Sequence, residues 1–321
     1  MHLINDFFLG LHRLEISTGT LAWASPWPFQ STTDYWGLLN RLRELMSWQM
    51  LALLPSCLFF YGCSMNPPAP PSTAFFYGAP LPVLALSEFD RVVVEAENVK
   101  DLDGLRAAGA EVFAYVSVGE AEAWRGSSRE LPQTLFMGAN PAWQSRVADL
   151  TLPGWRDYLI EQRMAQLWAT GYRGFFLDTL DSYQIVAKDL EAQGAQSKAL
   201  VEIIRAMHQR FPGVQLLFNR GFEVLPEVRA LAVGLVAESL FQRWNPVAQV
   251  YESVSEKDRV WLLAKLNHAR LRYGLPITVI DYVPPEKPEL AWATARQIAA
   301  LGFGPWVATP GLDMIFHGAK K

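Results

Sequence analysis

Eight short, almost uniformly apolar segments alternate with longer segments of helical periodicity along most of this chain. The apolar segments are residues 74–77, 91–94, 112–118, 174–177, 215–218, 234–237, 277–280 and 305–308. Strands that are buried on both faces have this composition, and they occur in parallel sheets covered by helices. Eight such strands over about 240 residues have the size and rhythm of a (β/α)8 barrel. The sequence therefore predicts an α/β fold, a TIM barrel formed by a single domain.

The segments between the predicted strands favour helices around this barrel. Residues 155–169 and 190–211 each place their large apolar side chains near one helical face. An open doubly wound sheet is the main alternative. That fold normally carries a glycine-rich phosphate-binding turn after its first strand, and the sequence YGAP at residues 77–80 is not one.

Charge and composition argue against two classes of ligand. The 321 residues carry a net charge of −4 and no run of lysine or arginine longer than a pair, so we expect no nucleic acid partner. The five histidines are scattered, and the two cysteines, Cys57 and Cys63, lie in the N-terminal region. We therefore expect no disulfide framework, no metal and no cofactor. The 12 Trp, 10 Tyr and 18 Phe residues suit sugar rings, which stack on aromatic planes.

Residues 1–73 are predicted to be an N-terminal extension with a signal-like segment and a linker. Arg41 and Arg43 precede an apolar run over residues 50–61, and a proline-rich stretch over residues 66–72 follows it. This order is typical of a secretory signal, and the run is short for a membrane span. Because a signal normally begins a chain, we interpret the first 40 or so residues as preceding the true start of translation. A short apolar helix of a cytoplasmic protein is the alternative.

Cys63 is a candidate for a lipid anchor. The sequence FYGC at residues 60–63 resembles a lipoprotein cleavage box, although its aromatic residues match that box poorly. The predicted location is the periplasm or the exterior of the cell, with an outer-membrane lipoprotein as one form. The barrel is expected over residues 74–316, followed by a tail over residues 317–321.

Polar side chains follow six of the predicted strands, at the carboxyl ends where a barrel of this kind carries its active site. They are Glu95 and Glu97, Glu120 and Glu122, Asp178 and Asp181, Asn219 and Arg220, Glu238, and Asp281 with Tyr282. This clustering predicts an acidic cleft with an aromatic rim.

Asp178 and Glu238 are the predicted catalytic carboxylates. Each follows at least three apolar residues, so each is expected to be partly desolvated, which raises the pKa of a carboxyl group towards the range used in general acid catalysis. Hydrolysis of a glycosidic bond needs two such groups on either side of the bond. The alternative is that Asp178 caps a helix and Glu238 pairs with an arginine.

Ten further residues at or near the strand ends are predicted to bind substrate. They are Tyr77, Tyr115, Ser117, Glu120, Asp181, Tyr183, Asn219, Arg220, Asp281 and Tyr282. Several have structural alternatives that the sequence leaves open. Arg220 can lock a neighbouring carboxylate, Asp281 can be a solvated loop charge or part of an ion pair, and any one tyrosine can be a packing residue.

Four motifs together resemble glycoside hydrolase families 114 and 166, and within them the hydrolase domains of Pel-type exopolysaccharide proteins. The motifs are YVSVGEAE at residues 115–122, GYRGFFLDT at 171–179, NRG at 219–221 and VAES at 236–239. The resemblance implies a TIM barrel that acts as an endo-hydrolase on α-1,4-linked galactosamine and N-acetylgalactosamine polymers in the periplasm. By motif position it implies Asp178 as nucleophile or stabiliser and Glu238 as acid/base. The deacetylase activity of longer Pel-type proteins is not carried over.

Two alternatives to this hydrolase stay open. One is a catalytically inactive barrel that binds carbohydrate, or docks, within an exopolysaccharide export assembly, whose proteins would then be partners. In the other, the chain is a glycoside hydrolase that acts on a different sugar. The sequence leaves this open because hydroxyl stereochemistry is recognised by fine geometry. A polysaccharide is the expected ligand in every case.

Overall fold

The computed structural model describes residues 69–122, 128 and 130–316, within the compact unit Asn66–Lys321. The predicted signal, Cys63 and the C-terminal tail lie outside these residues. Over the described ranges, no helix combines the length and the apolar character needed to cross a bilayer.

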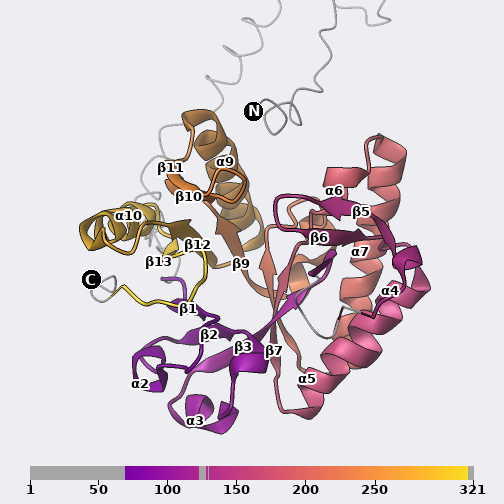
Figure 1. The fold of residues 1–321 in the computed structure, drawn as a ribbon, viewed down its shortest axis with the longest axis horizontal. Helices are drawn as coiled ribbons and strands as arrows, with labels where there is room; N and C mark the ends of the chain where they lie inside the picture. The colour runs from indigo at the N-terminus through magenta and orange to yellow at the C-terminus, as the bar shows by residue number, and fades with distance from the viewer. Residues whose placement is uncertain (1–68, 123–127, 129, 317–321) are drawn as a thin grey trace, which may run out of the picture. The chain divides into compact units, whose positions relative to one another are not determined.

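Eight parallel strands form the barrel in the order β1-β2-β3-β7-β8-β9-β12-β13 (Figure 1). Their bounds are β1 Thr73–Phe76, β2 Arg91–Val94, β3 Glu111–Ser117, β7 Gly174–Asp178, β8 Gln215–Asn219, β9 Ala232–Glu238, β12 Ile277–Tyr282 and β13 Gly304–Ala308. The first and last strands lie beside each other, so the barrel is nearly closed. Each predicted apolar segment overlaps one of these strands, and the predicted TIM barrel is confirmed.

Helices connect the strands on the outside of the barrel. They are α2 Val83–Leu86, η3 Ala96–Asn98, α3 Leu102–Ala107, α4 Pro153–Asp157, η6 Tyr158–Met164, α5 Ala165–Ala169, α6 Tyr183–Val186, α7 Leu190–Arg210, α8 Leu225–Val228, η7 Arg229–Leu231, α9 Glu256–Tyr273 and α10 Pro288–Ala300. The helix predicted over residues 155–169 is continuous through α4, η6 and α5, and its middle part is π-helical. Asp189 and Ser255 start α7 and α9 by accepting hydrogen bonds from backbone N–H groups.

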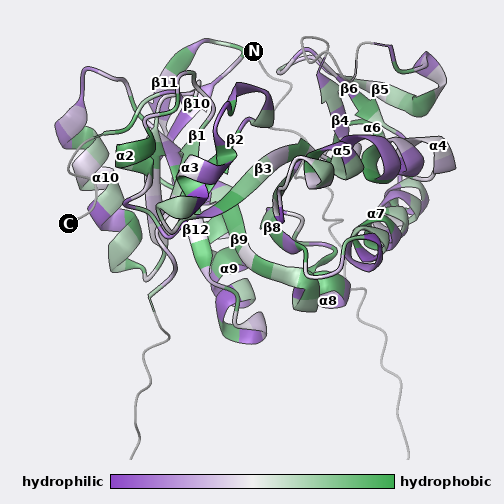
Figure 2. Ribbon diagram, turned by 90° about the horizontal axis from the view of Figure 1, so that it is seen from below, coloured by the Kyte–Doolittle hydropathy of each residue, from purple (hydrophilic) through white to green (hydrophobic). Residues whose placement is uncertain are grey.

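The core lies inside the barrel and between its strands and helices. Phe75, Phe113, Phe175 and Phe218, one from each of four strands, are completely buried. In Figure 2 the strands are largely in the hydrophobic colour, whereas α7 carries much of the hydrophilic colour. Burial on both faces explains why these strands read as apolar runs rather than as an alternating pattern.

Two small antiparallel sheets follow the carboxyl ends of β3 and β9. The first comprises β4 Glu120–Glu122, β5 Phe136–Asn140 and β6 Ser145–Ala148, and the second pairs β10 Gln242–Asn245 with β11 Val250–Ser253. A 3-10 turn, η5 Gln133–Leu135, precedes β5. These sheets were not predicted from the sequence, because their strands are short and carry many polar residues. Since they extend β3 and β9 at their carboxyl ends, both belong to the face of the barrel that carries the predicted site.

Candidate active site

Three neighbouring strands of the barrel end in polar residues that face one another. β7 ends at Asp178, β8 at Asn219 and β9 at Glu238, and β8 lies between the other two. Since parallel strands present their carboxyl ends at the same rim, the asparagine lies between the two acids.

One amide group joins the two carboxylates. Asn219 Nδ2 donates to Asp178 Oδ1 at 2.7 Å and to Glu238 Oε1 at 2.9 Å. The distance between Asp178 Oδ1 and Glu238 Oε1 is therefore at most the sum of these two hydrogen-bond lengths. Only the NH2 end of the asparagine can face two acceptors, which leaves its Oδ1 buried and without a hydrogen-bond partner.

Two tyrosines bind the remaining oxygen of each acid. The Tyr115 hydroxyl lies 2.9 Å from Asp178 Oδ2 and 3.2 Å from Glu122 Oε1, and it can donate to one of them at a time. The Tyr282 hydroxyl donates to Glu238 Oε2. Tyr77 packs edge-on against Tyr115, with 5.5 Å between the ring centroids. Tyr115, Asn219 and Tyr282, all predicted from the sequence as substrate-binding residues, thus contact the acids themselves.

Burial dominates the electrostatics of this pair. It raises the pKa of Asp178, against hydrogen bonds from Thr179, Asn219 and Tyr115 that lower it. Burial also raises the pKa of Glu238, and the nearby charge of Asp178 raises it further. Two close carboxylates titrate as a coupled pair, so ionisation of one raises the pKa of the other.

Arg220 pairs with Asp181 at the side of the site. Arg220 Nε lies 3.3 Å from Asp181 Oδ2, and both side chains are partly exposed. The guanidinium lies over the Trp261 ring, 5.4 Å from its centroid. The arginine therefore locks a neighbouring carboxylate, which is the structural alternative that the sequence left open.

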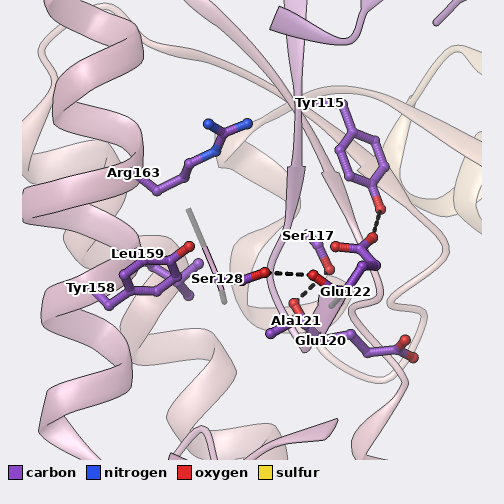
Figure 3. Close-up of a pocket in the computed structure, with 9 residues that line it drawn as sticks. All are labelled: Tyr115, Ser117, Glu120, Ala121, Glu122, Ser128, Tyr158, Leu159 and Arg163. Atoms are coloured by element: carbon purple, nitrogen blue, oxygen red, sulfur yellow. Dashed lines mark hydrogen bonds between the residues drawn. The ribbon is translucent and has the colours of Figure 1, made fainter. Parts of the chain in front are cut away.

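A small cavity of about 20 Å³ lies beside Tyr115 (Figure 3). Figure 3 shows Tyr115 and Glu122 on one side of it, and Arg163 and Tyr158 on the η6 side. Arg163 pairs with Glu97 at 2.6 Å and lies 3.8 Å from Glu95, so these two glutamates form strand-end ion pairs. Ser117 donates to the Glu120 carbonyl oxygen and lies 3.0 Å from Thr179 Oγ1, which directs its hydroxyl to the protein.

Three predicted substrate-binding residues have side chains that are buried among protein groups and that do not contact Asp178 or Glu238 through any hydrogen bond found in the described residues. Tyr183 is 3% exposed and packs in the hydrophobic core. Glu120 is 5% exposed and accepts hydrogen bonds from Asn140, Ser145 and Ser182. In this structure both side chains are packed or hydrogen-bonded within the protein.

Asp281 is the third of these buried residues. It is completely buried, and it accepts hydrogen bonds from the backbone N–H groups of Leu240, Phe241 and Gln242 at 2.6–2.8 Å. Burial raises its pKa to about 7, although the three N–H groups lower it. It is therefore neither a solvated charge nor part of an ion pair, and it holds the turn that follows Glu238.

Within the described residues, no group of three or more His, Cys, Asp or Glu side chains is arranged to hold a metal ion. The chemistry that the site offers consists of two carboxylates, two phenols and one amide at the rim of the barrel. Glycosidic bonds are hydrolysed by pairs of Asp or Glu side chains, and this pair is of that kind.

Comparison with known proteins identifies the family of this chain. The glycoside-hydrolase family GH114 matches residues 65–320. The chain belongs to this family. Comparison with curated protein sequences gives no match.

Two solved structures are similar to this GH114 member. The glycoside hydrolase domain of PelA from Pseudomonas aeruginosa is 41% identical, with a TM-score of 0.69, and the alignment covers 76% of this chain and 97% of that domain. Ega3 from Aspergillus fumigatus, solved in complex with galactosamine, is 16% identical, with a TM-score of 0.54 and coverage of 76% of this chain and 92% of Ega3. At that identity, Ega3 supports the fold alone.

Proposed function

We propose that this GH114 member is an endo-acting, retaining hydrolase of α-1,4-linked galactosamine and N-acetylgalactosamine polymers. The observation that carries the proposal is the Asn219 amide that bridges Asp178 and Glu238 at 2.7 and 2.9 Å. The sum of these distances is below the spacing of about 6.5–9.5 Å that admits a water between the acids of inverting enzymes. Because this sum is an upper limit on the separation of Asp178 Oδ1 and Glu238 Oε1, it favours the shorter carboxyl spacing of about 5–5.5 Å in retaining enzymes.

Asp178 is the nucleophile in the first step, and Glu238 is the general acid. Asp178 attacks the anomeric carbon while Glu238 transfers its proton to the glycosidic oxygen. The bond between that carbon and oxygen breaks, one part of the polymer leaves with a new hydroxyl group, and the other stays bound to Asp178 as an ester. Hydrogen bonds from Thr179, Asn219 and Tyr115 lower the pKa of Asp178 against the effect of its burial, which favours the ionised form that attacks.

Water completes the reaction in the second step. Glu238, now ionised, accepts a proton from a water molecule that attacks the same carbon, and the ester bond to Asp178 breaks. Two inversions give net retention, and both acids return to their starting protonation states.

The proposed substrate rests on similarity and on charge. The PelA hydrolase domain is 41% identical over most of this chain, and Ega3, which shares the fold, binds galactosamine. Galactosamine units carry ammonium groups, and the carboxylates of Glu122, Asp178, Asp181 and Glu238 line the rim that would receive them. A net charge of −4 favours the approach of such a cationic polymer.

Incubation of the purified chain with partly deacetylated galactosaminan tests the activity. We expect a mixture of oligosaccharides by mass spectrometry, and ¹H NMR of the first products should detect the α-anomer before mutarotation. Asp178→Asn and Glu238→Gln should each abolish release. Full activity of either variant would refute the assigned roles, and a β-anomer as first product would refute retention.

The alternative function is an inactive carbohydrate-binding or docking barrel of an export assembly. A chain that binds galactosaminan without releasing oligosaccharides from it would support this alternative. We also propose a periplasmic or secreted location with a lipid at Cys63. Labelling of cells with a tagged fatty acid tests the anchor, and a Cys63→Ala variant that takes up as much label as the parent would exclude it.

A further inference from the structure

Trp143 is exposed at the turn between β5 and β6. Its relative exposure is 56%, and among the large hydrophobic side chains that are exposed in the described residues it is the one aromatic. The residues on either side of it in the turn are small or polar, namely Pro141, Ala142 and Gln144. An exposed indole in such surroundings can be approached on its face.

The turn that presents Trp143 is held in place by a buried asparagine. Asn140 Oδ1 accepts from the Ala142 N–H group at 3.2 Å, and its carbonyl oxygen accepts from the Trp143 N–H group at 3.3 Å. Asn140 Nδ2 donates to Glu120 Oε1 at 3.0 Å. The turn is thus tied to the carboxylate at the start of β4.

Glu120 connects this turn to the loop that begins at Asp178. Its carboxylate accepts from Ser145 on β6 and from Ser182, four residues beyond the nucleophile. Ser145 and Ser182 are 2% and 6% exposed. Because a buried carboxylate is stable only when its oxygens are hydrogen-bonded, this network fixes the turn relative to the active-site face.

We propose that Trp143 is a distal subsite, where one hexosamine ring of the polymer stacks on the indole while another spans Asp178 and Glu238. This inference rests on the proposed function. The apolar face of a pyranose ring suits an aromatic plane, and the ammonium group of galactosamine adds a cation–π attraction that is strongest for tryptophan.

A sugar fits this position better than a protein partner does. A stable protein interface buries on the order of 800 Å² on each side around a cluster of apolar anchors. The turn offers one indole among small and polar residues, which suits one ring of a flexible polymer.

The test compares polymer and short substrate in matched variants of the full chain. In a Glu238→Gln background, affinity electrophoresis in galactosaminan gels should show binding weakened about tenfold by Trp143→Ala, and largely restored by Trp143→Phe. In the active enzyme, Trp143→Ala should raise KM for the polymer and leave kcat/KM for a trisaccharide unchanged. Leu190→Ala, which removes a side chain that is 87% exposed elsewhere, is the control and should change neither.

The outcomes separate this subsite from the proposed function. Normal polymer binding by an active Trp143→Ala enzyme would overturn the subsite alone. Equal losses on polymer and trisaccharide would also overturn it, because the residue would then act at the catalytic centre. If the parent chain cleaves nothing and Trp143→Ala still loses polymer binding, the hydrolase proposal fails and the subsite stands.

Discussion

Asn219 holds the two proposed catalytic acids in one arrangement, and its own carbonyl oxygen is buried with no hydrogen-bond partner among the described residues. An N–H donor shared by two carboxylates stabilises the ionised form of each. The site therefore depends on one neutral side chain for both its geometry and its charge state.

Replacement of Asn219 by alanine should move the pH dependence of the enzyme. Loss of the N–H donor raises the pKa of Asp178 further, so the acidic limb of the kcat/KM profile should shift to higher pH, and kcat/KM at the optimum should fall about 100-fold. Asn267→Ala on the outer helix α9 is the control. An unchanged acidic limb would exclude this role of Asn219.

Tyr115 and Tyr282 should each affect a different limb of the pH profile of kcat/KM. Tyr115→Phe removes a donor to Asp178 and should shift the acidic limb to higher pH, whereas Tyr282→Phe removes a donor to Glu238 and should shift the basic limb to higher pH. Stopped assays across pH 3–9 measure both. If Tyr282→Phe moved only the acidic limb, the roles of the two acids would have to be exchanged.

At the scale of elements, the ends of the strands decide which acids reach the substrate. Adjacent residues of a strand point to opposite sides, so Tyr282 reaches Glu238 while Asp281, its neighbour on β12, points to the turn over residues 240–242. One strand end thus supplies both a contact to the site and support for the loop that follows Glu238.

Asp281→Ala should destabilise the barrel more than it changes the chemistry. The substitution leaves one buried and two partly buried N–H groups without their acceptor, at a cost of about 1–3 kcal/mol for each group that water does not reach. Urea unfolding should therefore give a loss of about 3 kcal/mol, whereas Asp313→Ala, at an exposed site, should cost less than about 1 kcal/mol. Equal losses of stability in the two variants would contradict the role of Asp281 in holding the turn over residues 240–242.

At the scale of the whole molecule, the buried acids of the site lower the free energy of unfolding at neutral pH. Buried acids with raised pKa values bind protons more tightly in the folded state than in the unfolded chain. The stability from this binding is complete below the unfolded pKa and is lost as the pH rises through the folded pKa. Active sites commonly carry such a cost.

Glu238→Gln should consequently be more stable than the parent at neutral pH. Thermal melting should show a Tm higher by a few degrees at pH 8, since 1 kcal/mol shifts Tm by about 2–4 °C in a domain of this size. The difference should vanish near pH 4, below the unfolded value of 4.5, where the parent is protonated. A constant difference across this range would contradict the raised pKa of Glu238.

The overall charge predicts a salt effect on a cationic substrate. Between about 20 mM and about 500 mM NaCl, kcat/KM for deacetylated polymer should fall several-fold, because salt screens long-range attraction. The fully acetylated polymer is neutral and is the matched control. A similar fall for both polymers would indicate a general effect of salt on the enzyme.

Much of this architecture is determined by the sequence itself. The eight strands could be predicted because burial on both faces requires continuous apolar runs, and Asp178 and Glu238 stood out because each follows such a run at a strand end. The NRG and VAES motifs likewise place Asn219 and Glu238 at the ends of neighbouring strands, where parallel pairing brings them together.

Only the tertiary structure decided which of the similar residues face the site. Asp178 and Asp281 both follow buried strands, yet one meets Asn219 and the other meets three backbone N–H groups of a loop 40 residues away in sequence. Trp143 did not stand out in the sequence, because its exposure depends on the hydrogen bonds that tie its turn to Glu120. Local sequence patterns predict the strand end at which a side chain lies. The path of the loops in the folded protein determines which groups that side chain contacts.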